Sequence, residues 1–416
     1  MNIMIYIYVA LWPLFNQYVI IDLGSGIPDI TVQILLVPLL MISTVLAGKS
    51  KSFGEFAPWL FLFILYSLIT SVFHANTSTL HIFQLLIQVY ALPYMIYFIL
   101  FNNRDKVNYK YLSYAIIIGG LFISATGVAE FIAGKNLIGK VDYDESIGVS
   151  LYRTNGPFHD SIGYASLLLL YLSYIYYSYS KDVLPKKFLL ISSIFIGFGS
   201  FVNFSRAAIL GLLVVFVSSF SKNPKKLFVM LFVGFIVSVP ILFIFSDIVD
   251  QITSSKLVQQ RTDTQTMEVR WSLYNYVLDT VVANPLLGIG YDNFILVHGG
   301  ATHNSYLQVL VELGFIGLII FLIFIWKLVV SNIRDAIRRK QPVNLRTMMG
   351  IGFVVLFIPN TIVLLQSPHF MTILMIVIGA ISAHEKSSAL SESSVELQND
   401  KITLKENHSG VRLRDK

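Results

Sequence analysis

The sequence predicts an all-α protein that crosses a lipid bilayer about twelve times. Hydrophobic residues make up 55% of the 416 residues and charged residues only 13%, and there are 31 Phe and 22 Tyr. A soluble domain carries about 25% charged residues, so too few polar groups remain here to cover the surface of a soluble protein. The aromatic content suits lipid-facing helices with aromatic ends.

Apolar runs of bilayer length, about 17–25 residues, recur along the chain. We place them at residues 3–21, 27–47, 56–73, 80–101, 111–133, 160–179, 188–203, 206–220, 227–246, 304–326, 347–365 and 370–384. Only Asn203, Ser205 and Arg206 interrupt the apolar stretch from 188 to 220. A single helix over this stretch would be about 50 Å long, which is too long for a membrane. We therefore expect a tight hairpin at Asn203–Arg206.

The charge of successive connections alternates, and this predicts the orientation. One side holds seventeen basic residues, namely Lys49, Lys51, Arg104, Lys106, Lys110, Lys181, Lys186, Lys187, Lys222, Lys225, Lys226, Lys327, Arg334, Arg338, Arg339, Lys340 and Arg346. The other side holds seven, namely Lys135, Lys140, Arg153, Arg206, Lys256, Arg261 and Arg270. By the positive-inside rule the first side is cytoplasmic. Both termini are then expected inside the cell.

Two long connections, residues 134–159 and 247–303, are expected outside. In the larger one, the helical spacing of apolar residues predicts a surface helix over Glu268–Ala283. The membrane domain is expected to span residues 1–385. The polar residues 386–416 are expected to form a disordered cytoplasmic tail.

Several classes of chemistry are excluded or disfavoured by the sequence. The absence of cysteine excludes disulfides, iron–sulfur clusters and thiolate zinc sites. The net charge of +6 reflects basic residues gathered in the connections on one side of the membrane, so we expect no nucleic-acid partner. Asp142 and Asp144 have the Asp-x-Asp spacing by which many soluble glycosyltransferases hold a metal ion. A solvated acidic loop is the better interpretation of these two residues here. No nucleotide-binding or metalloprotease motif is present, and we expect no cofactor and no metal.

Four short polar clusters are predicted at the outer face: residues 152–160, 203–206, 270–290 and 302–317. The spans after the first, second and fourth clusters run inward, so their helix N-termini face outward and favour anions. Asp160, Ser205 and either Thr302 or Asn304 are plausible N-caps there.

Each charged residue of these clusters also has a simpler explanation. Arg206 could reach the membrane interface from a hairpin, and Arg153 could pair with a nearby acidic residue. Arg270 could be an exposed charge on its helix, and His303 a residue at a helix start. Gathered at one face, they favour a site for a phosphate or pyrophosphate group, because the Arg fork donates two parallel hydrogen bonds.

Glu312 is not expected to contact His303. The two residues are nine apart, so on one straight helix they lie half a turn off and about 13.5 Å apart along the axis. An intramembrane carboxylate needs a partner, and we expect Glu312 to bond a neighbouring span or line a cavity.

The order of four motifs resembles a known family. Arg153, Gly156 and Phe158 form an Arg-x-x-Gly-x-Phe segment before a span, and residues 205–208 read Ser-Arg-Ala-Ala. An Arg-containing helix leads to Asn-Pro-Leu-Leu-Gly-Ile-Gly at residues 284–290. His-Asn-x-x-Leu at 303–307 and Glu-x-Gly-x-x-Gly at 312–317 follow. Over about residues 150–325 the chain resembles the O-antigen ligase and polymerase superfamily, although Ala207 replaces the commoner Gly.

The resemblance implies a fold similar to GT-C glycosyltransferases and an activity at the outer leaflet. The enzyme would transfer a glycan from a polyprenyl-pyrophosphate carrier to an acceptor hydroxyl, without a metal. Arg206 and Arg270 would hold the pyrophosphate as it leaves, and His303 would orient or deprotonate the acceptor. The implied substrate contacts are Arg153, Asn304 and Arg261.

The resemblance leaves two activities open, a ligase with a lipid-core acceptor and a polymerase with a carrier-linked acceptor. Any bacterium that produces polysaccharide can need a polymerase, whereas a ligase requires a lipid A core, so we favour the polymerase. A twelve-helix transporter or flippase of lipid-linked oligosaccharide is the alternative, but no internal repeat is present and the charges gather at one face, not at the midplane. The expected location is the bacterial inner membrane, and other proteins of polysaccharide assembly are candidate partners.

Overall fold

The computed structural model describes residues 2–17, 19–21, 30–47, 52–74, 79–135, 137, 154–158, 161–203, 206–220, 264–298, 301–360 and 363–388. The predicted ninth span, the acidic Asp142–Asp144 loop and the tail from residue 389 lie outside these residues. The last described helix reaches Ser388, so it runs past the predicted start of the tail at 386.

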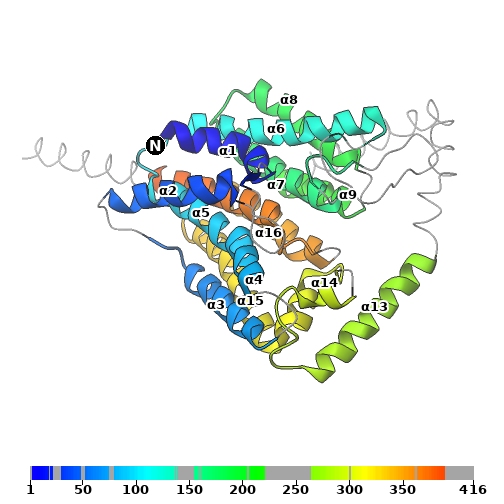
Figure 1. Ribbon diagram of the computed structural model, residues 1–416. Helices are drawn as coiled ribbons and strands as arrows, with labels where there is room; N and C mark the ends of the chain where they lie inside the picture. Colours follow the sequence, from blue (N-terminus) through cyan, green and yellow to red (C-terminus); the bar gives the residue numbers. More distant parts are fainter. Residues whose placement is uncertain are drawn as a thin grey trace, which may run out of the picture.

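The described chain is almost entirely helical (Figure 1). Its helices are α1 (Asn2–Gln17), α2 (Val32–Leu46), α3 (Ala57–Val72), α4 (Thr79–Leu86), η1 (Ile87–Ala91), α5 (Leu92–Asn102), α6 (Tyr109–Ala133), α7 (Ser161–Ser180), α8 (Lys186–Phe201), α9 (Arg206–Phe220), α13 (Thr264–Ala283), α14 (Asn293–His298), α15 (Ser305–Arg338), α16 (Pro342–Phe357), η2 (Ile358–Asn360) and a last helix, Pro368–Ser388. The turn η1 is a π-helix that joins α4 to α5 without a break.

The all-α prediction needs one small correction. Two short strands, β1 (Val19–Ile21) and β2 (Ile30–Thr31), pair antiparallel between α1 and α2. Their β-branched residues favour extended backbone. As a result, the predicted spans 3–21 and 27–47 each include strand residues at the end where the two meet.

Four of the described helices are long and apolar enough to cross a membrane by length and composition. They are Thr79–Asn102, Tyr109–Ala133, Ser305–Arg338 and Pro368–Ser388, and shorter apolar helices accompany them. The last is the most enclosed, with 78% of its apolar window buried against 56–61% for the others. The chain is thus a helical membrane protein built around Pro368–Ser388.

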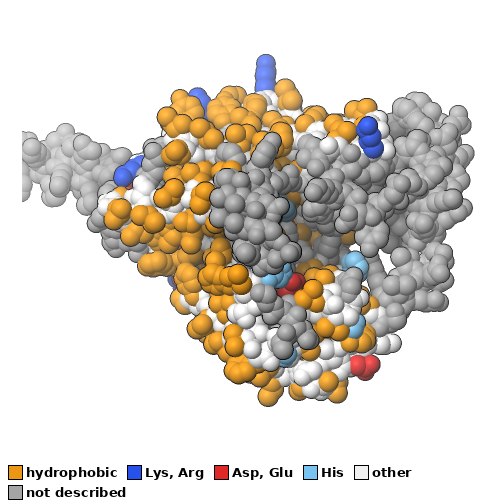
Figure 2. Space-filling model, viewed as in Figure 1, with side chains coloured by type: hydrophobic (Ala, Val, Ile, Leu, Met, Phe, Trp, Pro, Cys, Tyr) orange, Lys and Arg blue, Asp and Glu red, His pale blue; other side chains and the backbone are white. Residues whose placement is uncertain are grey.

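The helices form one continuous bundle. In Figure 1, α1, α6, α7, α8 and α9 lie in the upper part, and α3, α4, α5 and α15 lie below. Close packing joins α1 to α6, α7 to α8 and α9, α3 to α15, and α16 to both α9 and α15. A single apolar core runs through all of these helices. Many hydrophobic side chains are exposed on the face shown in Figure 2, as expected for a surface that contacts lipid.

Local signals in the sequence set several helix ends. The side chain of Asn108 accepts hydrogen bonds from the N–H groups of Lys110 and Tyr111 at the start of α6. Gly134 ends the same helix in the left-handed region, with φ of 62°. The predicted hairpin is also confirmed, because α8 ends at Phe201, α9 begins at Arg206 and the two helices pack together.

Candidate active site at one end of the bundle

The first turns of α9 and α15 lie at the same end of the bundle. The Tyr306 hydroxyl of α15 donates to the Leu356 carbonyl at the end of α16, at 3.1 Å. A Cβ added to Gly211 of α9 would overlap Leu169 of α7 and lie 3.3 Å from Ile358, which follows α16. The starts of α9 and α15 therefore flank the same end of α16.

The predicted site residues fall into three groups. His303 and Asn304 are fully described and directly precede α15. Arg206 is the first residue of α9 and Arg270 lies on α13, but their side chains are outside the described residues. Arg153 and Arg261 lie outside the described residues altogether. The helix predicted over Glu268–Ala283 is confirmed as α13, and Val277 and Val281 on its apolar stripe are buried.

Asn304 is the N-cap of α15. Its side-chain oxygen accepts hydrogen bonds from the N–H groups of Tyr306 at 2.9 Å and Leu307 at 3.1 Å. The hydroxyl of buried Thr302 donates to the Asn304 carbonyl at 2.8 Å and accepts from its N–H at 3.3 Å. Of the two caps that the sequence left open, Asn304 caps the helix and Thr302 braces the turn.

His303 lies between these two residues in a left-handed backbone conformation, with φ of 55°. Few non-glycine residues adopt this conformation, and it persists only where the surroundings impose it. The imidazole is exposed although Thr302 and Ser305 beside it are buried. The turn therefore presents one ionisable side chain at the end of the bundle.

A chain of buried hydrogen bonds from α15 stabilises the turn that carries His303. The Gln308 amide donates to Glu312 Oε1 at 2.6 Å, and Gln308 Oε1 accepts from the Thr302 N–H at 2.9 Å. Gln308 is completely buried and Glu312 is 1% exposed. The sequence predicts that Glu312 bonds a neighbouring span or lines a cavity. Its side-chain partner lies instead one turn earlier on its own helix, and the backbone of Asp292 and Phe294, around the start of α14, also hydrogen-bonds to it. Through Gln308, Glu312 reaches the His303 turn indirectly.

The two glycine-containing motifs form one backbone junction. The N–H groups of Ile289 and Gly290 donate to the carbonyls of Val311 at 3.1 Å and Glu312 at 2.7 Å. The Phe315 N–H donates to the Pro285 carbonyl at 2.8 Å. These bonds satisfy the backbone groups released where α15 is kinked at Gly314. The Tyr66 hydroxyl fixes the junction to α3 through the Leu313 carbonyl, at 3.1 Å.

The first polar cluster is held by a residue that the sequence analysis missed. Buried Glu130 of α6 accepts hydrogen bonds from the N–H groups of Asn155 at 3.1 Å and Gly156 at 2.8 Å. The Asn203 amide donates to the Thr154 carbonyl at 2.7 Å. This bond joins the first cluster to the second. A carboxylate inside the predicted span 111–133 was the available signal, because such a group needs partners.

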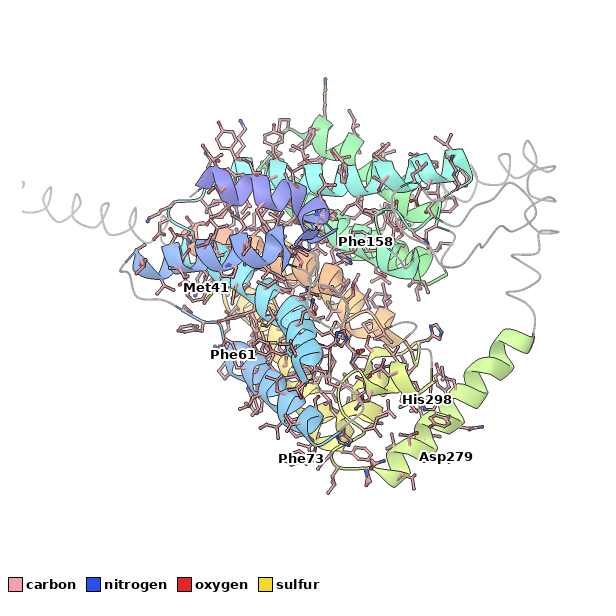
Figure 3. The ribbon with its side chains drawn as sticks, viewed as in Figure 1. Met41, Phe61, Phe73, Phe158, Asp279 and His298 are labelled. Atoms are coloured by element: carbon pink, nitrogen blue, oxygen red, sulfur yellow. The ribbon has the colours of Figure 1, made fainter. Side chains whose placement is uncertain are left out.

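The first cluster also contacts the last helix. Phe158, labelled in Figure 3, packs against His369 with ring centroids 4.6 Å apart and stacks on Trp12 at 6.2 Å. A few residues before His369, the Leu364 N–H donates to the Ser305 hydroxyl at 2.8 Å. Residues 364–369 therefore connect the first cluster to the start of α15.

A histidine and a carboxylate form an ion pair next to the junction, just after Gly290. His81 Nε2 is 3.4 Å from the Asp292 carboxylate. Burial raises the pKa of Asp292, and His81 acts in the opposite direction. Nearby, His298 of α14 packs on Tyr276 of α13 (Figure 3), and burial lowers its pKa. These contacts attach α13 and α14 to the membrane bundle.

The region that contains the junction and the His303 turn is similar to a known protein family. Residues 191–322 match the family model described as O-antigen ligase. These residues form a domain similar to the O-antigen ligase family. This domain spans about a third of the chain and includes α9, the junction and the first half of α15. It thus contains Arg206, Arg270 and His303. No curated protein matches the chain.

Proposed function

We propose that this O-antigen ligase domain transfers a glycan from a polyprenyl-pyrophosphate carrier to an acceptor hydroxyl at the outer face of the membrane. The observation that carries the proposal is the common position of the starts of α9 and α15 inside the family-matched region. One start has an arginine in its first turn, and the other has an exposed histidine.

In the proposed reaction the acceptor oxygen attacks the anomeric carbon of the donor sugar. The bond between that carbon and the carrier pyrophosphate breaks, and the carrier leaves with both electrons of the bond. We assign the binding of the leaving pyrophosphate to Arg206 and Arg270. The positive dipole end of α9 supports this assignment, because it favours an anion beside Arg206.

The proton of the acceptor hydroxyl passes to the imidazole of His303 in this scheme. Histidine is the side chain that most often acts as a general base in enzymes, because its imidazole can accept and release a proton under physiological conditions. The buried chain of Glu312, Gln308 and Thr302 fixes the turn on which His303 lies. We assign these three residues a positioning role.

The remaining substrate contacts are assigned to Arg153, Arg261 and Asn304. Capping occupies the side-chain oxygen of Asn304, so its proposed contact with the glycan uses the amide N–H groups. The proposal includes no metal, because the two arginines are proposed to stabilise the negative charge of the leaving pyrophosphate.

We favour a polymerase, which would use a second carrier-linked glycan as acceptor, over a ligase that uses a lipid core. The proposed location is the bacterial inner membrane with both termini cytoplasmic, and the proposed surroundings include other polysaccharide-assembly proteins. The transporter alternative is less favoured, because the family match is to ligases.

Purified protein in detergent tests the proposal. Given a polyprenyl-pyrophosphate oligosaccharide, EDTA and no nucleotide, it should extend or transfer the glycan. A ladder of repeats on a carrier-linked acceptor indicates a polymerase, and a single transfer to lipid-core sugar indicates a ligase. Absence of any covalent product with the cell's own donor and acceptor, together with movement of that donor across liposomes, contradicts the proposal in favour of transport.

A further inference from the structure

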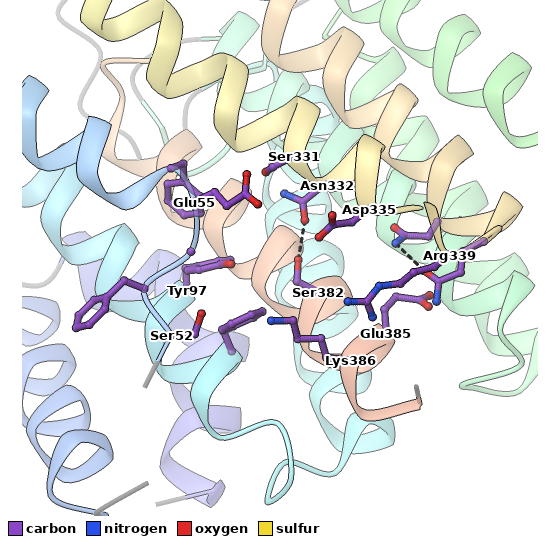
Figure 4. A pocket seen from close by; sticks show the side chains of 16 residues that line it. Ser52, Glu55, Tyr97, Ser331, Asn332, Asp335, Arg339, Ser382, Glu385 and Lys386 are labelled. Carbon is purple, nitrogen blue, oxygen red and sulfur yellow. Dashed lines mark hydrogen bonds between the residues drawn. The ribbon is translucent and has the colours of Figure 1, made fainter. Parts of the chain in front are cut away.

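A polar cavity lies at the opposite end of α15 from His303. Its volume is about 580 Å³, and its wall comes from the segment before α3, from α5, α15 and α16, and from the last helix (Figure 4). The ionisable residues in the wall are Glu55, Asp335, Arg339, Glu385 and Lys386. Cavities of this size accommodate small ligands.

Two of the carboxylates in the wall are already neutralised by cations. Glu385 Oε1 lies 2.8 Å from Lys181 Nζ and accepts a hydrogen bond from the Tyr177 hydroxyl at 2.8 Å. A guanidinium nitrogen of Arg334 lies 2.6 Å from Glu55 Oε2. These ion pairs balance the charges of Glu385 and Glu55, although Glu385 Oε2 has no hydrogen-bond partner among the described residues.

Lys386 and Arg339 are different. Among the described residues, neither has a carboxylate within the 4.0 Å of an ion pair. The Lys386 ammonium instead lies over the Phe101 ring, 4.2 Å from its centroid. Burial, Arg104 and Arg339 all disfavour the charge of this ammonium, and Asp335 acts in the opposite direction. Within the part of the chain that the structure describes, the cavity thus holds two positive charges that lack a bonded anion (Figure 4).

We propose that this cavity binds a phosphate group, with Lys386 and Arg339 as its charged contacts. Arg donates two parallel hydrogen bonds to phosphate oxygens, and Lys adds a point charge. An anion between them removes their repulsion. The hydroxyl-bearing residues Ser52, Tyr97 and Ser382 also line the cavity and suit a hydroxylated molecule attached to the phosphate. This site is separate from the proposed transfer reaction and does not depend on it.

The phosphate could belong to a lipid headgroup or to a soluble molecule. The seventeen-residue charge bias places this end at the cytoplasmic leaflet, where anionic lipids attract basic residues. Phe53 and Phe101 in the wall offer apolar surface for the part of a lipid next to its headgroup.

Thermal unfolding of the full-length protein in detergent tests the site. Phosphatidylglycerol, phosphatidylcholine and glycerol 3-phosphate are titrated separately. We expect a saturable rise in Tm with phosphatidylglycerol and less with phosphatidylcholine. The variant K386Q/R339Q should bind about thirtyfold more weakly. The control R338Q/K340Q removes the same charge from exposed residues at this end that do not line the cavity, and it should bind as the wild type does.

The outcomes separate the two sources and the alternative of general charge attraction. A saturable rise with glycerol 3-phosphate that K386Q/R339Q abolishes assigns the site to a soluble phosphate. Equal weakening in both double variants, or no saturable rise with any of the three compounds, contradicts the proposal. The K386R variant must retain the effect, since it keeps the positive charge. Lipid phosphate that copurifies with each variant provides a second measurement if K386Q/R339Q is poorly stable.

Discussion

Gly288 and Gly314 each lie against the other's chain segment. A Cβ on Gly288 would overlap the Glu312 carbonyl group, and a Cβ on Gly314 would overlap the backbone of Leu286. Both residues have positive φ, 70° and 64°. Each of the two positions therefore requires glycine for two reasons, its backbone conformation and the close approach of the other segment.

Substitution of either glycine by alanine should damage the junction. The left-handed conformation alone costs about 1–2 kcal/mol for alanine, and the overlap adds to this cost. We expect a lower Tm and a loss of transfer activity of tenfold or more for G288A and for G314A. Gly197 of α8 is the control, because its Cβ would meet open space. G197A should be neutral or stabilising by about 0.5–1 kcal/mol. Wild-type stability of G288A would contradict the proposed junction.

Gln308→Leu should reduce the rate of transfer while the affinity for the donor stays unchanged. The change removes the buried bonds to Thr302 and Glu312, and unsatisfied buried groups cost about 1–3 kcal/mol each. We expect kcat to fall about tenfold or more through displacement of His303. In an H303A background the same change should have little further effect. An equal loss in both backgrounds would show that Gln308 acts independently of His303.

Glu130 should stabilise the cluster before α7 mainly through the backbone N–H groups that it bonds. E130Q keeps an acceptor oxygen and should destabilise less than E130A, which leaves the N–H groups of Asn155 and Gly156 without it. Limited proteolysis and Tm measure the difference. Glu55→Gln is the comparison, because Glu55 is exposed and a surface ion pair contributes about 0–1 kcal/mol. If E130A were no less stable than E55Q, Glu130 would not hold this cluster.

His303→Ala should lower the transfer rate by about 10²–10⁴-fold, the usual contribution of a general base. Arg206→Ala and Arg270→Ala should reduce activity strongly, and Lys at either position should restore only part of it, because its point charge cannot donate a bidentate fork. Product analysis of proteins purified to equal amounts provides the measurement. Full activity of both Arg→Ala variants would remove the support for pyrophosphate binding.

The absence of cysteine from the chain allows a direct test of orientation. Val282 of α13 is 79% exposed, and Lys187 at the start of α8 is also exposed. In intact cells or spheroplasts, V282C should react with an impermeant thiol reagent and K187C should not. Lysed cells, in which both should react, provide the control. The reverse pattern would overturn the predicted topology.

The sequence predicted the elements that depend on local signals. The hairpin before Arg206 and a cap at either Thr302 or Asn304 follow from polar residues between apolar runs, and α13 follows from its helical stripe. The junction could not be predicted, because its hydrogen bonds join backbone groups 22 to 30 positions apart and backbone groups have no sequence signature. Periodicity also says nothing about the partner of Glu312, because an intramembrane carboxylate can bond along its own helix or across to another.

The kink in α15 has a consequence for how the protein can diversify. The junction attaches the segment between α13 and α15 to the membrane bundle through main-chain hydrogen bonds, so the path from α13 to the His303 turn is set by backbone geometry. Leu286 and Leu287 expose their side chains although their backbones take part in or adjoin the junction. Side chains at such positions can be replaced while the framework stays in place. Relatives that act on different sugars are expected to vary at these positions and to keep both glycines.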